Sequence, residues 1–248
     1  MTVMLNMKAI VILIILLTYT LLGNCQDKNN SLTLSISNNG ELQNVMHEFY
    51  FNPIGEYEPN NDVTQFNSVM LMFNLRYILT FKKTFLTIDG KYGYRKDEYN
   101  VSGSEFVTGK EYQSFLGISS HYGFFNKIEK IEVRSALGIN IYYINDYISR
   151  YHDDQPGQIL HTTLRSDGGF AIGITNLTGI TYYIKNWFSL NTNISFGIMN
   201  FDLGGKMQYT IEKQDPVIIN QNPDPYFSTY NLTTITKPDI TFGIGFHF

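Results

Sequence analysis

Histidines close to acidic or hydroxyl side chains are the residues of this sequence best suited to chemistry. One group is His152-Asp153-Asp154, with His161 nearby. On a surface loop these residues could bind a divalent cation or supply an Asp/His pair to a protease. A hard cation needs several oxygens in a fixed cage, however, and only two adjacent carboxylates are present. We therefore interpret the group as part of a solvated loop.

A second candidate is His121, which lies two residues from Ser119. A hydroxyl and an imidazole at that spacing could form half of a hydrolytic pair. We favour a structural histidine, because the strand pattern places His121 on an inward face. The sequence has no glycine-rich phosphate loop, no clustered Cys/His metal spacing and no heptad repeat. We therefore assign no catalytic residue, metal ligand or cofactor, and we expect a protein that is not an enzyme.

The elements that position these side chains are predicted to be β-strands, because apolar residues recur at every second position along them. The predicted strands cover residues 31–37, 68–81, 84–96, 112–124, 131–147, 164–182, 188–198 and 240–248. A weaker candidate at 41–51 leaves the start of the first strand open. The predicted short connections are 82–83, 126–130 and 184–186, and the long or polar ones are 38–66, 97–110, 148–161 and 200–238. Short and long connections alternate strictly, which favours an all-β, eight-stranded antiparallel up-and-down barrel.

The two faces of these strands differ in polarity. One face is apolar with few charges, and the other carries small and polar residues with an inward network of Arg76, Asp89, Lys91, His121, Glu132, Arg134, Arg165 and Asp167. A soluble ligand-binding barrel turns its apolar face inward, whereas a membrane barrel turns it outward. The uncharged apolar faces favour a transmembrane barrel whose interior is plugged by ion pairs and hydrogen bonds. A soluble lipocalin-like barrel is the alternative.

The first 25 residues are typical of an export signal. Lys8 is their only charge, and the apolar run from Ala9 to Leu22 is short for a membrane helix. Cleavage after Cys25 would leave a barrel domain of residues 26–248 without cysteine. Lipidation of Cys25 is the alternative. Loss of Lys8 takes the net charge from −4 to −5, and this acidic chain without an evident basic patch argues against nucleic-acid binding.

The last nine residues alternate and end on an aromatic residue. The outward set is Ile240, Phe242, Ile244, Phe246 and Phe248. This segment resembles the closing strand of bacterial outer-membrane barrels, and residues 31–248 resemble the small barrels of the OmpA-barrel and OmpX kind in their pattern. The resemblance implies a Gram-negative outer-membrane location. It also implies outer-membrane lipid and the barrel-assembly machinery as partners, with Phe242, Ile244, Phe246 and Phe248 as the assembly signal.

The sequence says less about activity than about architecture. We expect a monomer with a structural or surface-interaction role, binding an extracellular ligand through loops 52–66, 148–161 and 200–238. One alternative is a barrel enzyme acting on lipid or peptide. The other is a narrow, porin-like small-solute channel, which eight strands leave little room for.

Overall fold

The computed structural model describes residues 30–38, 42, 63–102, 106–155, 158–213 and 226–248. These residues form strands β1 (Asn30–Ser37), β2 (Val63–Thr80), β3 (Thr84–Ser102), β4 (Phe106–Ile128), β5 (Ile131–Ile144), β6 (Tyr147–Gln155), β7 (Gln158–Ser166), β8 (Gly169–Lys185), β9 (Phe188–Lys213), β10 (Tyr226–Ile235) and β11 (Asp239–His247). In this part of the chain, no helix is long and apolar enough to cross a membrane.

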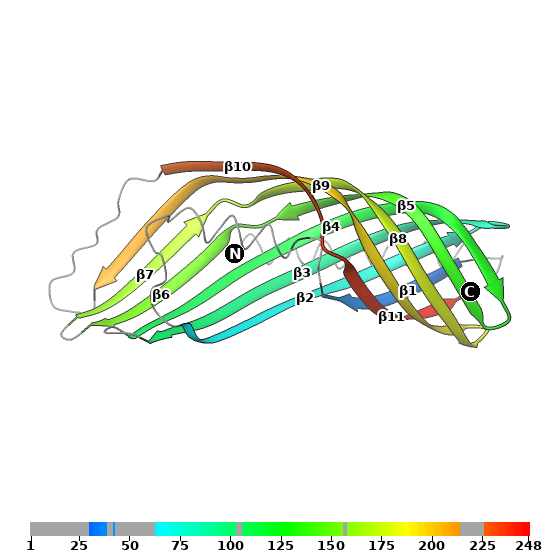
Figure 1. The fold of residues 1–248 in the computed structure, drawn as a ribbon, viewed down its shortest axis with the longest axis horizontal. Coiled ribbons are helices and arrows are strands. Elements are labelled where there is room, and N and C mark those ends of the chain that lie inside the picture. The colour runs from blue at the N-terminus through cyan, green and yellow to red at the C-terminus, as the bar shows by residue number, and fades with distance from the viewer. Residues whose placement is uncertain (1–29, 39–41, 43–62, 103–105, 156–157, 214–225) are drawn as a thin grey trace.

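Eight of the strands close into a ring in which every neighbour is antiparallel. The order is β1-β2-β3-β4-β5-β8-β9-β11, and β11 pairs again with β1 (Figure 1). Phe246 closes the ring by pairing with Leu32 on one side and Phe188 on the other. The predicted eight-stranded up-and-down barrel is therefore confirmed. Closure matters because it gives each of the eight strands a hydrogen-bonded neighbour on both sides within the ring. The ring closes over only part of the longer strands, since β1 covers β2 from Met72 to Leu79.

The two ends of the barrel are unlike. The short turns β2–β3, β4–β5 and β8–β9 lie at one end, where the amide of Phe248 donates to the carbonyl of Asn30 at 3.1 Å. At the opposite end β4 and β9 run on past the ring as part of a longer sheet (Figure 1). Strand β6 pairs with β4 and β7, while β9 pairs with β7 and β10. We call this part the extension. It consists of β6, β7, β10 and the ends of β3, β4 and β9 that continue beside them.

The extension corrects the predicted connections. Segment 97–110 belongs largely to β3 and β4, and segment 148–161 belongs largely to the hairpin β6–β7. Segment 200–238 contains the end of β9 and all of β10, and residues 63–66 begin β2. The sequence of these segments mixes polar and apolar residues without a sustained period of two, which is the pattern that marks a half-buried strand. Apart from Leu42, the candidate strand 41–51 lies outside the described residues, and so does most of loop 52–66.

Two further corrections concern strands that were predicted to be continuous. Segment 131–147 is interrupted at Asn145–Asp146, and segment 164–182 at Asp167–Gly168. Before each interruption the even-numbered residues point into the barrel, and after it the odd-numbered residues do. Opposite them, β9 exchanges β8 for β7 between Leu203 and Met207. Gly204 and Gly205 have φ of 92° and 144° there, which glycine adopts without steric cost.

The outer surface of the ring is a continuous apolar belt. Its exposed side chains include Leu71, Phe73, Ile88, Ile118, Tyr122, Leu137, Ile139, Ile172, Ile174, Phe196, Ile198 and Phe242. The inward positions of the same strands carry most of the buried polar residues. This is the polarity of a membrane barrel and the reverse of a soluble ligand-binding barrel.

Candidate functional site

The middle of the lumen holds a buried network centred on Asp89. Arg76 donates to both carboxylate oxygens of Asp89, from Nε at 2.6 Å and from Nη2 at 3.0 Å. The hydroxyl of Ser119 donates to Oδ2 of Asp89 at 2.9 Å. Arg76 and Asp89 are direct cross-strand partners on β2 and β3, which is why the two side chains meet. A bidentate, hydrogen-bonded pair of this kind offsets the cost of burying both charges.

His121 belongs to the same network. Its Nε2 lies 2.9 Å from Oγ1 of Thr175, and its Nδ1 lies 3.5 Å from Oγ1 of Thr87. Ser119 and His121 are both almost fully buried, and the Ser119 hydroxyl donates its hydrogen bond to Asp89. Their arrangement therefore links β3, β4 and β8 within the lumen.

Above this network the lumen is filled by apolar side chains. The cluster comprises Leu42, Met72, Phe115, Tyr142, Ile144, Tyr147, Leu164, Ala171, Met199, Phe201, Leu203 and Met207. Lys91 joins the two layers by donating to the Tyr142 hydroxyl at 2.8 Å. The lumen is thus plugged by a polar layer and an apolar layer. The sequence prediction named only the polar one, because it rested on the charged and polar residues of the inward face.

Two predicted members of the inward network lie elsewhere. The side chain of Arg165 is 63% exposed and pairs with Asp146 on the outer surface, where Nε and Oδ2 are 2.9 Å apart. Asp167 is exposed, and its Oδ2 accepts from the Lys206 amide at 2.8 Å. The cause is the parity shift at Asp167–Gly168, because Leu164 and Ser166 point inward on one side of it and Ala171 on the other.

The remaining two predicted residues form a separate cluster near the short-turn end. Arg134 pairs through Nε with Glu132, two residues earlier on the same inward face of β5. The Tyr183 hydroxyl donates to Oε2 of Glu132 at 2.8 Å. The Arg134 guanidinium lies 5.6 Å from the ring centre of Phe85. Phe85 belongs to a second, smaller cluster of buried apolar side chains. Both oxygens of Glu132 are therefore occupied.

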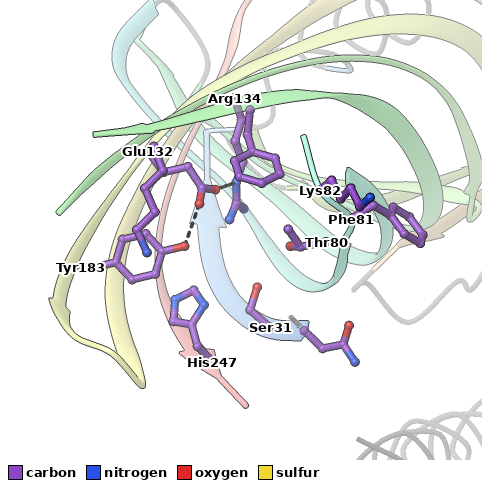
Figure 2. Close-up of a pocket in the computed structure, with 11 residues that line it drawn as sticks. Ser31, Thr80, Phe81, Lys82, Glu132, Arg134, Tyr183 and His247 are labelled. Carbon is purple, nitrogen blue, oxygen red and sulfur yellow. Dashed lines mark hydrogen bonds and ion pairs between the residues drawn. The ribbon is translucent and has the colours of Figure 1, made fainter. Parts of the chain in front are cut away.

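A cavity of about 570 Å³ opens at this end of the barrel. Figure 2 shows Glu132, Arg134, Tyr183 and His247 around it, with Ser31, Thr80 and Lys82 on the other walls. Nε2 of His247 lies 2.8 Å from Oγ of Ser189, and the rings of His247 and Tyr183 are 4.7 Å apart. Lys127 also lines the cavity, with Nζ 3.7 Å from the centre of the Tyr183 ring. We call this space the mouth cavity.

The turns around the mouth cavity are basic. The exposed lysines are Lys82, Lys83, Lys127, Lys130 and Lys185, and Glu129 is the acidic residue among them. We call this set the basic rim. The sequence showed no evident basic patch because these lysines are spread over more than a hundred positions. The lysine content of all three predicted short turns was the signal that could have revealed it.

The other sequence candidates are placed as follows. The backbones of His152 and His161 are direct partners in the β6–β7 hairpin of the extension, and their side chains lie outside the described set. Phe242 and Ile244 face outward on β11, and Phe246 and Phe248 are half-buried. Within the described residues, no group of three or more His, Cys, Asp or Glu side chains is placed to hold a metal ion.

Comparisons with known proteins add little beyond the fold. No family model and no curated protein matches the sequence. Among solved structures, Neisserial surface protein A matches with 10% identity over 89% of this chain and 97% of its own, at a TM-score of 0.34. A major outer membrane protein from Thermus thermophilus matches with 9% identity over 88% and 99%, at a TM-score of 0.43.

A third match is the ferric yersiniabactin uptake receptor FyuA from Yersinia pestis. It has 10% identity over 68% of this chain, at a TM-score of 0.38, and this chain spans 25% of the receptor. All three TM-scores are below 0.5, so they support no statement about activity. The fold assignment rests on the hydrogen-bonded ring itself.

Proposed function

We propose that this protein is an integral outer-membrane barrel that presents its extension at the cell surface for structural or binding interactions. The observation that carries the proposal is the apolar belt around a closed ring with a polar and plugged interior. Such a belt is costly in water and favourable in lipid, and a closed ring satisfies every strand's hydrogen bonds within the bilayer.

The orientation follows from the two ends of the barrel. Outer-membrane barrels have short turns on the periplasmic side and longer connections outside. The three short turns and the contact between Asn30 and Phe248 share one end, and the β6–β7 hairpin and β10 occupy the other. The extension would then stand outside the membrane on a rigid support, which suits recognition. The filled lumen favours this role over a channel.

Single cysteines at the two ends test the proposal in intact cells. Arg150→Cys places an exposed residue on β6 of the extension, and Lys127→Cys places one near the end of β4, beside the β4–β5 turn. A membrane-impermeant maleimide should label Arg150→Cys on intact cells and Lys127→Cys only after the outer membrane is permeabilised. The unaltered chain is the control, because any labelling of it must come from Cys25, the only cysteine in the sequence.

The opposite labelling pattern would reverse the orientation and remove the extension from the cell surface. Labelling of both positions in a soluble periplasmic fraction would contradict membrane insertion altogether. A Thr229→Cys variant, exposed on β10, is a second extension position and should behave like Arg150→Cys.

A further inference from the structure

The mouth cavity combines a definite volume with an excess of positive charge. Lys82, Lys127 and Arg134 line it, against the single acid Glu132. Both oxygens of Glu132 are taken up, one by Arg134 and the other by Tyr183. We propose that the mouth cavity binds a small soluble anion carrying phosphate or carboxylate oxygens.

The two lysines are the groups left to receive such an anion. Neither Lys82 nor Lys127 has an ion-pair partner among the described residues, and both are exposed at the opening. Nζ of Lys127 lies against the Tyr183 ring, which holds the ammonium at the wall of the cavity. Ammonium and guanidinium groups are the usual receptors for oxyanions.

The surroundings favour an anion as well. The basic rim encircles the opening, although the whole chain carries a net charge of −4. A concave site walled by protein and lined by one sign of charge concentrates counter-ions inside it. The volume of about 570 Å³ is typical of small-molecule sites, and the hydroxyls of Ser31 and Thr80 add neutral hydrogen-bonding groups.

The same chemistry could be offered by lipid headgroups of the inner leaflet, which would reach the rim from outside the barrel. The two sources differ in the lysines they need. A soluble anion in the cavity depends on Lys82 and Lys127, which line it, whereas a lipid headgroup has equal access to Lys83 and Lys130 in the same turns. This difference defines a matched control.

Calorimetric titration of the full-length barrel in an uncharged detergent, at fixed ionic strength, tests the proposal. The probes are inorganic phosphate and citrate. We expect saturable binding that the double variant Lys82→Gln/Lys127→Gln weakens at least tenfold. The control Lys83→Gln/Lys130→Gln removes the same charge from the same end of the barrel and should bind within about twofold of the unaltered chain, because screened charges outside the cavity contribute little.

Fluorescence of Trp187 gives a second readout at the same end. It is the only tryptophan in the sequence, and its carbonyl accepts from the amide of His247 at 3.0 Å. Its emission should saturate with the calorimetric signal and respond to the cavity variant alone. Equal weakening by both double variants, or no saturable binding of either probe, would overturn the proposal. So would binding only to phosphatidylglycerol vesicles, which would assign the basic rim to lipid.

Discussion

Asp89 is the residue on which the buried polar layer converges. It accepts from Arg76 and Ser119, and Nδ1 of His121 lies 3.8 Å from its Oδ2. The charges of Asp89 and Arg76 are buried away from water, so each depends on the other for its solvation. The Arg76–Asp89 pair is therefore stable while both charges are present, and removing either charge alone is costly.

Asp89→Asn should destabilise the barrel by about 3–5 kcal/mol, because it leaves the Arg76 guanidinium buried without its counter-charge. Urea unfolding in detergent or lipid vesicles measures this directly. The control is Glu98→Gln, which breaks an ion pair of similar length with Lys96, 2.7 Å apart, on the exposed part of β3. Its unfolding curve should not change. Equal effects of the two substitutions would contradict a buried, mutually dependent pair.

Glu111 lies in the extension, beyond the apolar belt, and burial raises its pKa to about 7. The neighbouring Asp97 carboxylate adds to the rise, while Tyr147 and Arg95 oppose it. The pKa in the unfolded chain is near 4.5, so the unfolded state releases the proton first as pH rises. The contribution of Glu111 to stability should therefore be greatest below about pH 4.5 and fall until about pH 7, by at most roughly 3 kcal/mol.

Glu111→Gln should remove that part of the pH dependence, because glutamine does not titrate. Unfolding free energies at about pH 5 and about pH 8 should then differ less in the variant than in the unaltered chain. If both proteins lose the same stability between these values, Glu111 is not the group that titrates.

On strand β3, Gly93 lies under the aromatic ring of its cross-strand partner Phe115 on β4. A Cβ at Gly93 would fall 1.7 Å from the Phe115 ring, whereas one at Gly90 would meet nothing within 4 Å. Phe115 cannot move freely, because it packs edge-on against Tyr142 with ring centres 6.4 Å apart in the apolar plug.

Gly93→Ala should therefore cost about 1–3 kcal/mol, since the ring must leave a packed core to make room. Gly90→Ala makes the same chemical change on the same strand and should be neutral or slightly stabilising. Parallel urea titrations compare them. A neutral Gly93→Ala would mean that the plug is loosely packed around Phe115.

The eight strands of the ring could be predicted from sequence because each has one face against lipid and one against the lumen. That difference produces the period of two along segments such as 131–144 and 188–198. The extension lacks this contrast, so 148–161 and 200–213 resembled loops although they are paired strands. Backbone hydrogen bonds hold these strands together, and the amino-acid pattern does not record them.

The polar residues of the interior could be predicted from the same alternation of faces. Arg76, Asp89, Lys91, His121, Glu132 and Arg134 follow from inward parity, and the structure buries all six. Arg165 was misplaced because its parity was carried across the break at Asp167–Gly168. Which inward residues touch depends on register between strands, and a single sequence with no paired partner in view does not specify register.

At the scale of the whole molecule, three features separate along the barrel axis. The basic rim and the mouth cavity lie at the short-turn end. The ring, with its filled lumen and apolar outer surface, lies in the middle. The extension lies at the far end (Figure 1). The ring is the part that needs a bilayer, because its outward surface is predominantly apolar. The basic rim is charged, which suits water at that end of a membrane barrel.

The most direct test of a closed membrane barrel is gel mobility of the outer-membrane fraction, with and without boiling. A closed ring in which every strand is paired on both sides should resist cold detergent and migrate apart from the heated, unfolded chain. We predict a band in that fraction that shifts on boiling. A soluble periplasmic protein without a shift would contradict the membrane barrel, because the apolar belt would then have to face water.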